Sequence, residues 1–254
     1  MDEQFKNIPK SKKIYLASDF HLGAPDLQSS QLREKKIVRW LSSIEKDAVG
    51  IILVGDIFDF WFEYRHAIPK GFVRFIGKIA ELRDRGIPVL FFTGNHDIWM
   101  ADYFEKEMGV QIYSQPRSFL IGSNQVYIGH GDGLGPGDCK FKFYKKIFTN
   151  PLAQWAFRWL HPDLGIGLAK KWSNSSKEAY NDLPFQEDKE WLIIHSKEIE
   201  QSTHHDYYIY GHRHLFAEYD LSPDAKYINL GEWMSGSTYL TIDSISAKLS
   251  RFEE

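Results

Sequence analysis

The sequence has a single cysteine, Cys139, among its 254 residues, which excludes an intramolecular disulfide and argues against a zinc site built from thiolates. It has no apolar run approaching the roughly 18 residues that a membrane-spanning helix requires. Its first residues lack the basic and apolar segments of a signal peptide. Internal repeats and low-complexity segments are also absent. We therefore expect a globular protein of a reducing, cytoplasmic compartment.

Acidic residues are scarce in one segment, although the net charge of the whole chain is only −3. Between Lys140 and Lys177 there are seven Lys and one Arg against Asp163, a net charge of +7, so the rest of the chain carries −10. A basic segment on an acidic body favours an anionic substrate or an anionic surface. The chain length and its 43% hydrophobic residues suit one α/β domain with an inserted segment.

The stretch Ile51–Val54 is apolar and mostly β-branched, which predicts a buried strand. It ends in Gly55-Asp56, so a carboxylate stands at the carboxyl end of the strand, where ligands bind in open α/β sheets. Four further clusters of potential metal ligands each follow an apolar run: Asp19-Phe20-His21, Gly94-Asn95-His96-Asp97, Gly129-His130 and Gly211-His212-Arg213-His214. Five such coincidences predict a two-metal phosphoesterase site with Asp56 between the metals.

The order of apolar runs and helical patterns predicts the fold. We expect strands at residues 13–18, 51–54, 88–92, 126–128 and 207–210, with helices at 29–45 and 72–85 between the first three. Strand–helix–strand alternation indicates parallel strands. Residues 227–230 and 238–242 are expected to be antiparallel strands that finish a second sheet. If the backbone of Asp19-Phe20-His21 is extended, its two polar side chains point the same way.

In their order and spacing, the five clusters resemble the calcineurin-like metallophosphoesterases. The resemblance implies a four-layer α/β/β/α sandwich, a single domain over residues 1–254, and here a helical insertion, residues 138–185, over the metal edge. It implies that Asp56 bridges two metals. The ligands of one metal would be Asp19, His21, Asp56 and His214, and those of the other Asp56, Asn95, His130 and His212.

The chemistry of these side chains agrees with such a site. Imidazole, carboxylate and amide oxygen without thiolate suit two divalent ions, Mn, Fe or Zn. Only Asp19 and Asp56 are anionic, so the surplus positive charge would bind phosphate oxygens and acidify a water. Asp59 and Asp97 are expected to brace or orient other groups, and Arg213 to point away from the metals. The remaining histidines are expected to be structural or exposed: His66, His161, His195, His204 and His205.

The insertion combines aromatic and basic residues. Between Pro151 and Leu160 only Gln154 and Arg158 are polar, so a helix there is apolar nearly all round. Either both of its faces are buried in the protein, or it forms a lid that contacts acyl chains or lies on a membrane surface. Ser173 and Lys177 are four residues apart, so on a helix they share a face and could grip a phosphate together.

A closer resemblance, to the UDP-2,3-diacylglucosamine hydrolases of lipid A synthesis, runs through the insertion. It is carried by Ser18–Leu22, Gly55–Trp61, His130–Asp132, Ser173–Ala179 and Leu230–Trp233. It implies Mn-dependent hydrolysis at the α-phosphorus of this nucleotide-diphospho lipid, which releases UMP and 2,3-diacylglucosamine 1-phosphate, next to the inner membrane. The catalytic residues would be His96, Asp56 and Asn95, and the substrate-binding residues His96, Ser173, Lys177 and His212.

One residue departs from that pattern, because these hydrolases typically have Arg at the position of His96. A phosphate leaving group, with a second pKa of about 6, scarcely needs an acid. An alkoxide does, so His96 keeps open a phosphodiesterase or phosphomonoesterase with a nucleotide or nucleic-acid substrate. A nuclease would use the basic segment to hold nucleic acid, which is the less favoured partner. A non-catalytic, metal-stabilised scaffold is the third hypothesis.

Overall fold

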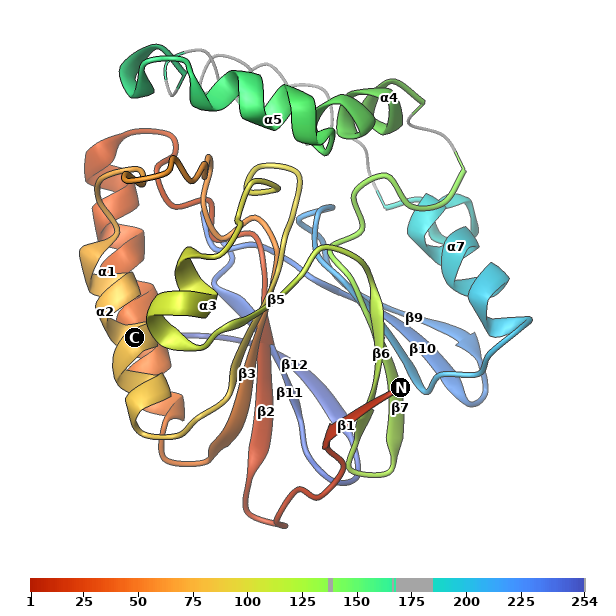
Figure 1. Ribbon diagram of the computed structural model, residues 1–254. Coiled ribbons are helices and arrows are strands. Elements are labelled where there is room, and N and C mark those ends of the chain that lie inside the picture. Colours follow the sequence, from red (N-terminus) through yellow and green to blue (C-terminus); the bar gives the residue numbers. More distant parts are fainter. Residues whose placement is uncertain (137–138, 166, 168–184, 254) are drawn as a thin grey trace.

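The computed structural model describes residues 1–136, 139–165, 167 and 185–253, and two six-stranded sheets lie face to face at its centre (Figure 1). The first sheet comprises β2 (Lys13–Ala17), β3 (Ala48–Val54), β4 (Val89–Phe92), β5 (Gln111–Tyr113), β11 (Thr238–Ile242) and β12 (Ala247–Arg251), in the order β12-β11-β2-β3-β4-β5. The second comprises β1 (Asp2–Phe5), β6 (Arg117–Ile121), β7 (Asn124–Ile128), β8 (Tyr207–Tyr210), β9 (Phe216–Ser222) and β10 (Ala225–Leu230), in the order β1-β6-β7-β8-β10-β9.

Helices cover the outer faces of both sheets (Figure 1). They are α1 (Leu27–Ile44), α2 (Val73–Asp84) and α3 (Tyr103–Met108) on the first sheet and α7 (Trp191–Glu200), which follows the 3-10 turn η1 (Glu187–Lys189), on the second. In β3, Ile51 and Leu53 pack beneath the helices, whereas Ile52 and Val54 pack between the sheets. Burial of both faces explains the uninterrupted apolar run. The predicted four-layer α/β/β/α sandwich is confirmed.

The helix α1 shows how the sequence sets an outer layer. Asp26 caps its N-terminus, because the carboxylate accepts a hydrogen bond from the Ser29 amide at 2.9 Å. Ile37, Trp40 and Ile44 recur at helical spacing and are buried against the first sheet. Each such side chain stabilises the fold by about 1.5–3 kcal/mol.

Parallel pairing brings the ends of distant strands to one edge. β2, β3 and β4 are parallel neighbours in the first sheet, as predicted, and β7, β8 and β10 are parallel neighbours in the second. The helices of the insertion, α4 (Cys139–Phe148) and α5 (Pro151–Arg158), lie across the top of Figure 1 at this edge. The division of the chain into one domain with an insertion over residues 138–185 stays a prediction.

The prediction that residues 227–230 and 238–242 finish one sheet is wrong. β10 joins the second sheet between β8 and β9, whereas β11 returns to the first sheet and pairs with β2 and β12. Ile228 of β10 and Leu240 of β11 are nevertheless buried in the same layer between the sheets. Alternating apolar residues report only which face is buried, and here two strands bury that face from opposite sides.

Candidate metal centre

Five of the seven predicted ligands have a left-handed backbone, with φ between +43° and +65°: Asp19, His21, Asp56, His212 and His214. Such φ values are uncommon for residues other than glycine, and they concentrate at functional sites. The condition of an extended backbone at Asp19-Phe20-His21 is therefore not met. The side chains of Asp19 and His21 converge because the chain turns, not because they alternate along a strand.

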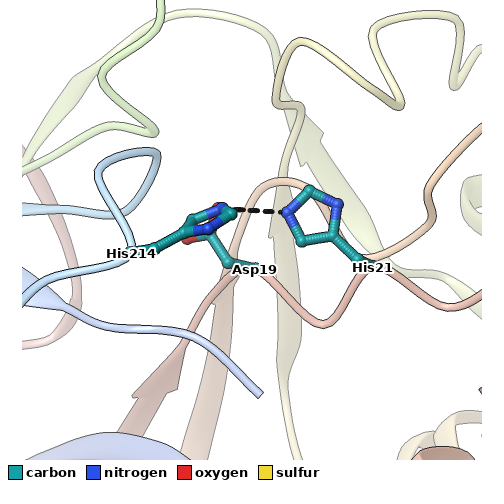
Figure 2. A group of neighbouring side chains, drawn as sticks. All are labelled: Asp19, His21 and His214. Carbon is teal, nitrogen blue, oxygen red and sulfur yellow. Dashed lines mark hydrogen bonds and ion pairs between the residues drawn. The ribbon is translucent and has the colours of Figure 1, made fainter. Parts of the chain in front are cut away.

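Asp19, His21 and His214 form a first group, shown in Figure 2. Their nearest ligand atoms lie within 4.8 Å of one another. Nε2 of His21 is 3.0 Å from Nε2 of His214, and Nε2 of His214 is 3.2 Å from Oδ1 of Asp19. Asp19 follows β2 and His214 follows β8, so the group joins the two sheets.

Asp56, His130 and His212 form a second group. Oδ1 of Asn95 lies 2.9 Å from Nδ1 of His212 and 3.3 Å from Nε2 of His130. Nδ1 of His130 donates to the Val54 carbonyl at 2.8 Å, which directs Nε2 toward this group. Oδ2 of Asp56 lies 3.3 Å from Nε2 of His130 and 3.8 Å from Nε2 of His21, so this carboxylate faces both groups.

A third group consists of His21, Asp59 and His96. Nδ1 of His96 donates to the Asp59 carbonyl at 3.1 Å, and Oδ1 of Asp59 is 3.7 Å from Nδ1 of His21. The backbone amide of His96 donates to Oδ1 of Asp56 at 2.9 Å. Asp59 thus orients His96 through its main chain while its side chain stands within reach of a metal ligand.

Two glycines permit these close approaches. A Cβ atom on Gly94 would collide with the Asp56 carboxylate, and one on Gly55 would collide with the His130 ring. The backbone at Gly55 also has φ +81°, which other residues rarely adopt. The glycines of Gly55-Asp56 and Gly94-Asn95 are therefore required because no side chain fits between the backbone and the neighbouring ligands.

The electrostatics of the site are those of buried carboxylates among imidazoles. Burial favours protonation of Asp19 and Asp56, but the neighbouring histidines outweigh it and hold the pKa of both carboxyls well below the usual range. Burial opposes a charge on His21 and on His130, yet the carboxylates raise the pKa of these rings to about 9 and about 10. Burial and the neighbouring His130 lower the pKa of His212 to about 3.

These residues fit divalent metal ions. Oδ1 of Asp19 and Nδ1 of His21 are buried without a hydrogen bond of good geometry from the described residues. A buried polar atom without a hydrogen bond costs free energy of folding. A cation between the groups would be coordinated by the nitrogen and oxygen atoms that face one another there. The donor set is imidazole nitrogen, carboxylate and amide oxygen, which suits first-row divalent metals.

Two buried residues, Asp97 and Arg33, support the loops that carry the predicted ligands. Asp97 accepts hydrogen bonds from the amides of Gly94 and Ile57, both at 2.7 Å, so it ties two loops together rather than orienting a ring. Burial, then the charge of Asp56, raises the pKa of Asp97 to about 7. Arg33 donates to the carbonyls of His21 and Ala24.

The sequence reasoning missed Arg33, although a signal existed. Arg33 lies four residues before Ile37 and seven before Trp40, so it occupies the buried face of α1. A cation at such a position indicates a specific partner.

The structure brings together all seven predicted metal ligands and His96, but not every predicted substrate residue. Ser173 and Lys177 lie outside the described residues. Arg213, between two predicted ligands, pairs with Glu190 on the opposite side of its loop, next to Trp191 of α7. None of the three groups includes the other histidines of the chain: His66, His161, His195, His204 and His205.

The sequence matches the calcineurin-like phosphoesterase family over residues 12–216, and the protein belongs to this family. It is a phosphoester hydrolase, and the family implies divalent metal ions for which the groups of Asp and His provide ligands.

Relatives of this protein indicate which phosphoester hydrolases it resembles. The UDP-2,3-diacylglucosamine hydrolase of Porphyromonas gingivalis is 34% identical over 263 residues, an alignment that covers 95% of this chain and 98% of the relative. The hydrolase of the same name from Shewanella baltica is 25% identical, with 89% and 91% covered. Among solved structures, the phosphoesterase Yfce from E. coli matches with a TM-score of 0.45 and 14% identity over 94% of this chain and 92% of that chain. The predicted resemblance to the metallophosphoesterases and to these hydrolases is confirmed.

Proposed function

We propose that this protein hydrolyses UDP-2,3-diacylglucosamine at the α-phosphorus and releases UMP and 2,3-diacylglucosamine 1-phosphate, a step of lipid A synthesis. The observation that carries the proposal is the near full-length similarity to the Porphyromonas gingivalis hydrolase of that name. The groups of Asp and His side chains could hold metal ions, and metal ions can activate the water that such a hydrolysis requires.

Two divalent ions, manganese in the first place and iron or zinc otherwise, are proposed for this site. One would be held by Asp19, His21, Asp56 and His214, and the other by Asp56, Asn95, His130 and His212. When bound, the ions supply positive charge that activates a water and stabilises phosphate oxygens. Asp56 is placed to serve both positions, because its Oδ2 faces His21 and His130.

His96 is proposed to contact the phosphate that is cleaved, with Asn95 beside it. Its Nδ1 donates to the Asp59 carbonyl, which fixes the orientation of the ring. An imidazole in this position can hold a phosphate oxygen or give it a proton. His212, Ser173 and Lys177 are the further proposed substrate contacts. The proton-donating role would suit a phosphodiester or phosphomonoester, and His96 is the observation that keeps this second function open.

Membrane contact is proposed for the outer face of α5. Leu152, Trp155 and Trp159 are 75%, 61% and 76% exposed, so the helix is not buried on both faces. Two cations are also exposed, Arg158 of α5 and Lys146 of the adjoining α4. Aromatic rings beside cations bind the surface of anionic bilayers. In the part of the chain that the structure describes, no helix combines the length and the apolar character needed to cross a bilayer. We place the protein in the cytoplasm, peripheral to the inner membrane.

The reaction is tested with purified protein, Mn²⁺ and UDP-2,3-diacylglucosamine, and release of UMP is the expected result. Asp56→Asn is the matched inactive control. It keeps the size of the side chain but removes its charge, and it should release no UMP. Absence of UMP together with rapid hydrolysis of a soluble phosphodiester would favour the second function. Fewer than two metal ions per chain would overturn both.

Vesicle sedimentation tests the membrane contact. The wild-type protein should co-sediment with anionic vesicles, and the double variant Trp155→Ser/Trp159→Ser should stay in the supernatant. The matched control Ile245→Ser removes an apolar side chain that is 81% exposed in the turn between β11 and β12, and it should sediment as the wild type does. Equal sedimentation of all three proteins would contradict the assignment of the face.

A further inference from the structure

The helix α4 is held against the loop that carries His130. Nζ of Lys145 donates to Oδ2 of Asp132 at 2.6 Å and to the Asp132 carbonyl at 3.1 Å. Lys142, three residues earlier and on the same face of the helix, donates to the Gly135 carbonyl. Two lysines of the insertion thus contact the chain immediately after a proposed ligand.

The C-terminal end of α4, three residues after Lys145, is held by a different ligand loop. Nε1 of Trp99 donates to the Phe148 carbonyl at 2.7 Å. Carbonyls in the last turn of a helix lack partners within the helix, so this bond caps α4. Trp99 also packs against the Phe157 ring of α5 at 4.7 Å between centroids. Trp99 lies four residues after Asn95, on the same loop.

The two loops meet at one metal position. Oδ1 of Asn95 is 3.3 Å from Nε2 of His130, and both residues are proposed ligands of the second metal. Asp132 is only 5% exposed, and such a carboxylate needs a counter-charge, which Lys145 provides at hydrogen-bond distance. α4 therefore contacts both the loop of Asn95 and the loop of His130, and the second metal would join the same two loops through these two side chains.

We propose that Lys145 and Trp99 are positioning residues that couple the insertion to the second metal position, so that a divalent ion bound between Asn95 and His130 also fixes α4 and α5. The inference rests on the metal centre proposed above. The coupling is reciprocal, because anything that stabilises the docked helices stabilises the arrangement of the ligand loops by the same free energy.

Hydrogen–deuterium exchange tests the coupling without measuring turnover. Metal-stripped protein is compared with the same protein after addition of Mn²⁺, and the amides of residues 139–158 are followed. In the wild type, Mn²⁺ should slow their exchange by roughly tenfold, the factor that corresponds to one net hydrogen bond. Lys145→Met and Trp99→Phe should lose most of this slowing. Lys145→Arg, which keeps the charge, should retain it.

Lys146→Met is the matched control, because Lys146 is the exposed neighbour of Lys145 on the same helix, and it should behave as the wild type does. Calorimetric titration with Mn²⁺ separates the two proposals. If the wild type binds no metal, the metal centre itself is refuted. If it binds metal while exchange in α4 stays unchanged, or slows equally in Lys145→Met and Trp99→Phe, the coupling is refuted. Should Lys145→Met fail to fold, Trp99→Phe carries the test, because it keeps an aromatic ring at this position and removes the indole N–H donor.

Discussion

Replacing Arg213 by Met removes the cation that ties the loop of His212 and His214 to the start of α7. Nε and Nη2 of Arg213 donate to the two carboxylate oxygens of Glu190 at 2.9 and 3.2 Å, and the two side chains are 3% and 1% exposed. Methionine fills similar space but leaves the Glu190 carboxylate buried without this partner, which costs about 3–5 kcal/mol. For a chain of this length, that loss lowers Tm by about 6–20 °C.

Differential scanning calorimetry of the metal-free protein measures this effect. The double variant Arg213→Met/Glu190→Gln should recover most of the lost stability, because no ionised carboxylate remains buried. Lys197→Met is the control, since it breaks an exposed ion pair with Asp188 near the same helix and should cost no more than about 1 kcal/mol. A fall in Tm for Arg213→Met no larger than that for Lys197→Met would refute the reasoning.

Three further predictions concern the site. Arg33→Met removes the side-chain donor of the Ala24 carbonyl, at about 1–3 kcal/mol, and leaves the His21 carbonyl with the Ala24 amide as its donor. It should weaken metal binding in calorimetric titration, whereas the exposed Lys35→Met should not. His96→Ala should lower kcat by a factor that grows with leaving-group pKa if His96 gives a proton, and by an equal factor for all leaving groups if it only holds phosphate. Removal of metal with EDTA should lower Tm, and Mn²⁺ at 100 times its Kd should restore about 2.7 kcal/mol per site, which a Tm unchanged by EDTA would contradict.

The layers of the fold could be predicted because its central strands are buried on both faces. A strand in that position must be apolar without interruption, so β8 occupies the predicted range Tyr207–Tyr210 and α2 differs from its predicted range by one residue at each end. The ligand clusters were visible for a related reason, since each directly follows such a strand. Strand ends and polar residues are local features of the sequence.

The parts that were missed depend on contacts between distant residues. The pairing of Arg213 with Glu190 joins residues 23 apart, and nothing near either residue identifies the partner. The sheet to which β11 belongs is decided by the path of the chain between Leu230 and Thr238, not by the alternation within the strand. The left-handed backbone at Asp19 and Asp56 was not predictable either, because Asp adopts it more often than most residues but still in a small minority of cases.

The left-handed ligands also bear on how this protein would change under laboratory evolution. Each such residue costs the folded chain on the order of 1–3 kcal/mol, which glycine would largely avoid. A screen for heat resistance that never supplies a divalent metal should therefore enrich glycine at His212 and His214, which are only partly buried. At His21, which is fully buried, the cavity left by the ring would offset the gain. The variants recovered would be more stable to heat but catalytically inactive. Selection in the presence of the metal ion would retain these histidines.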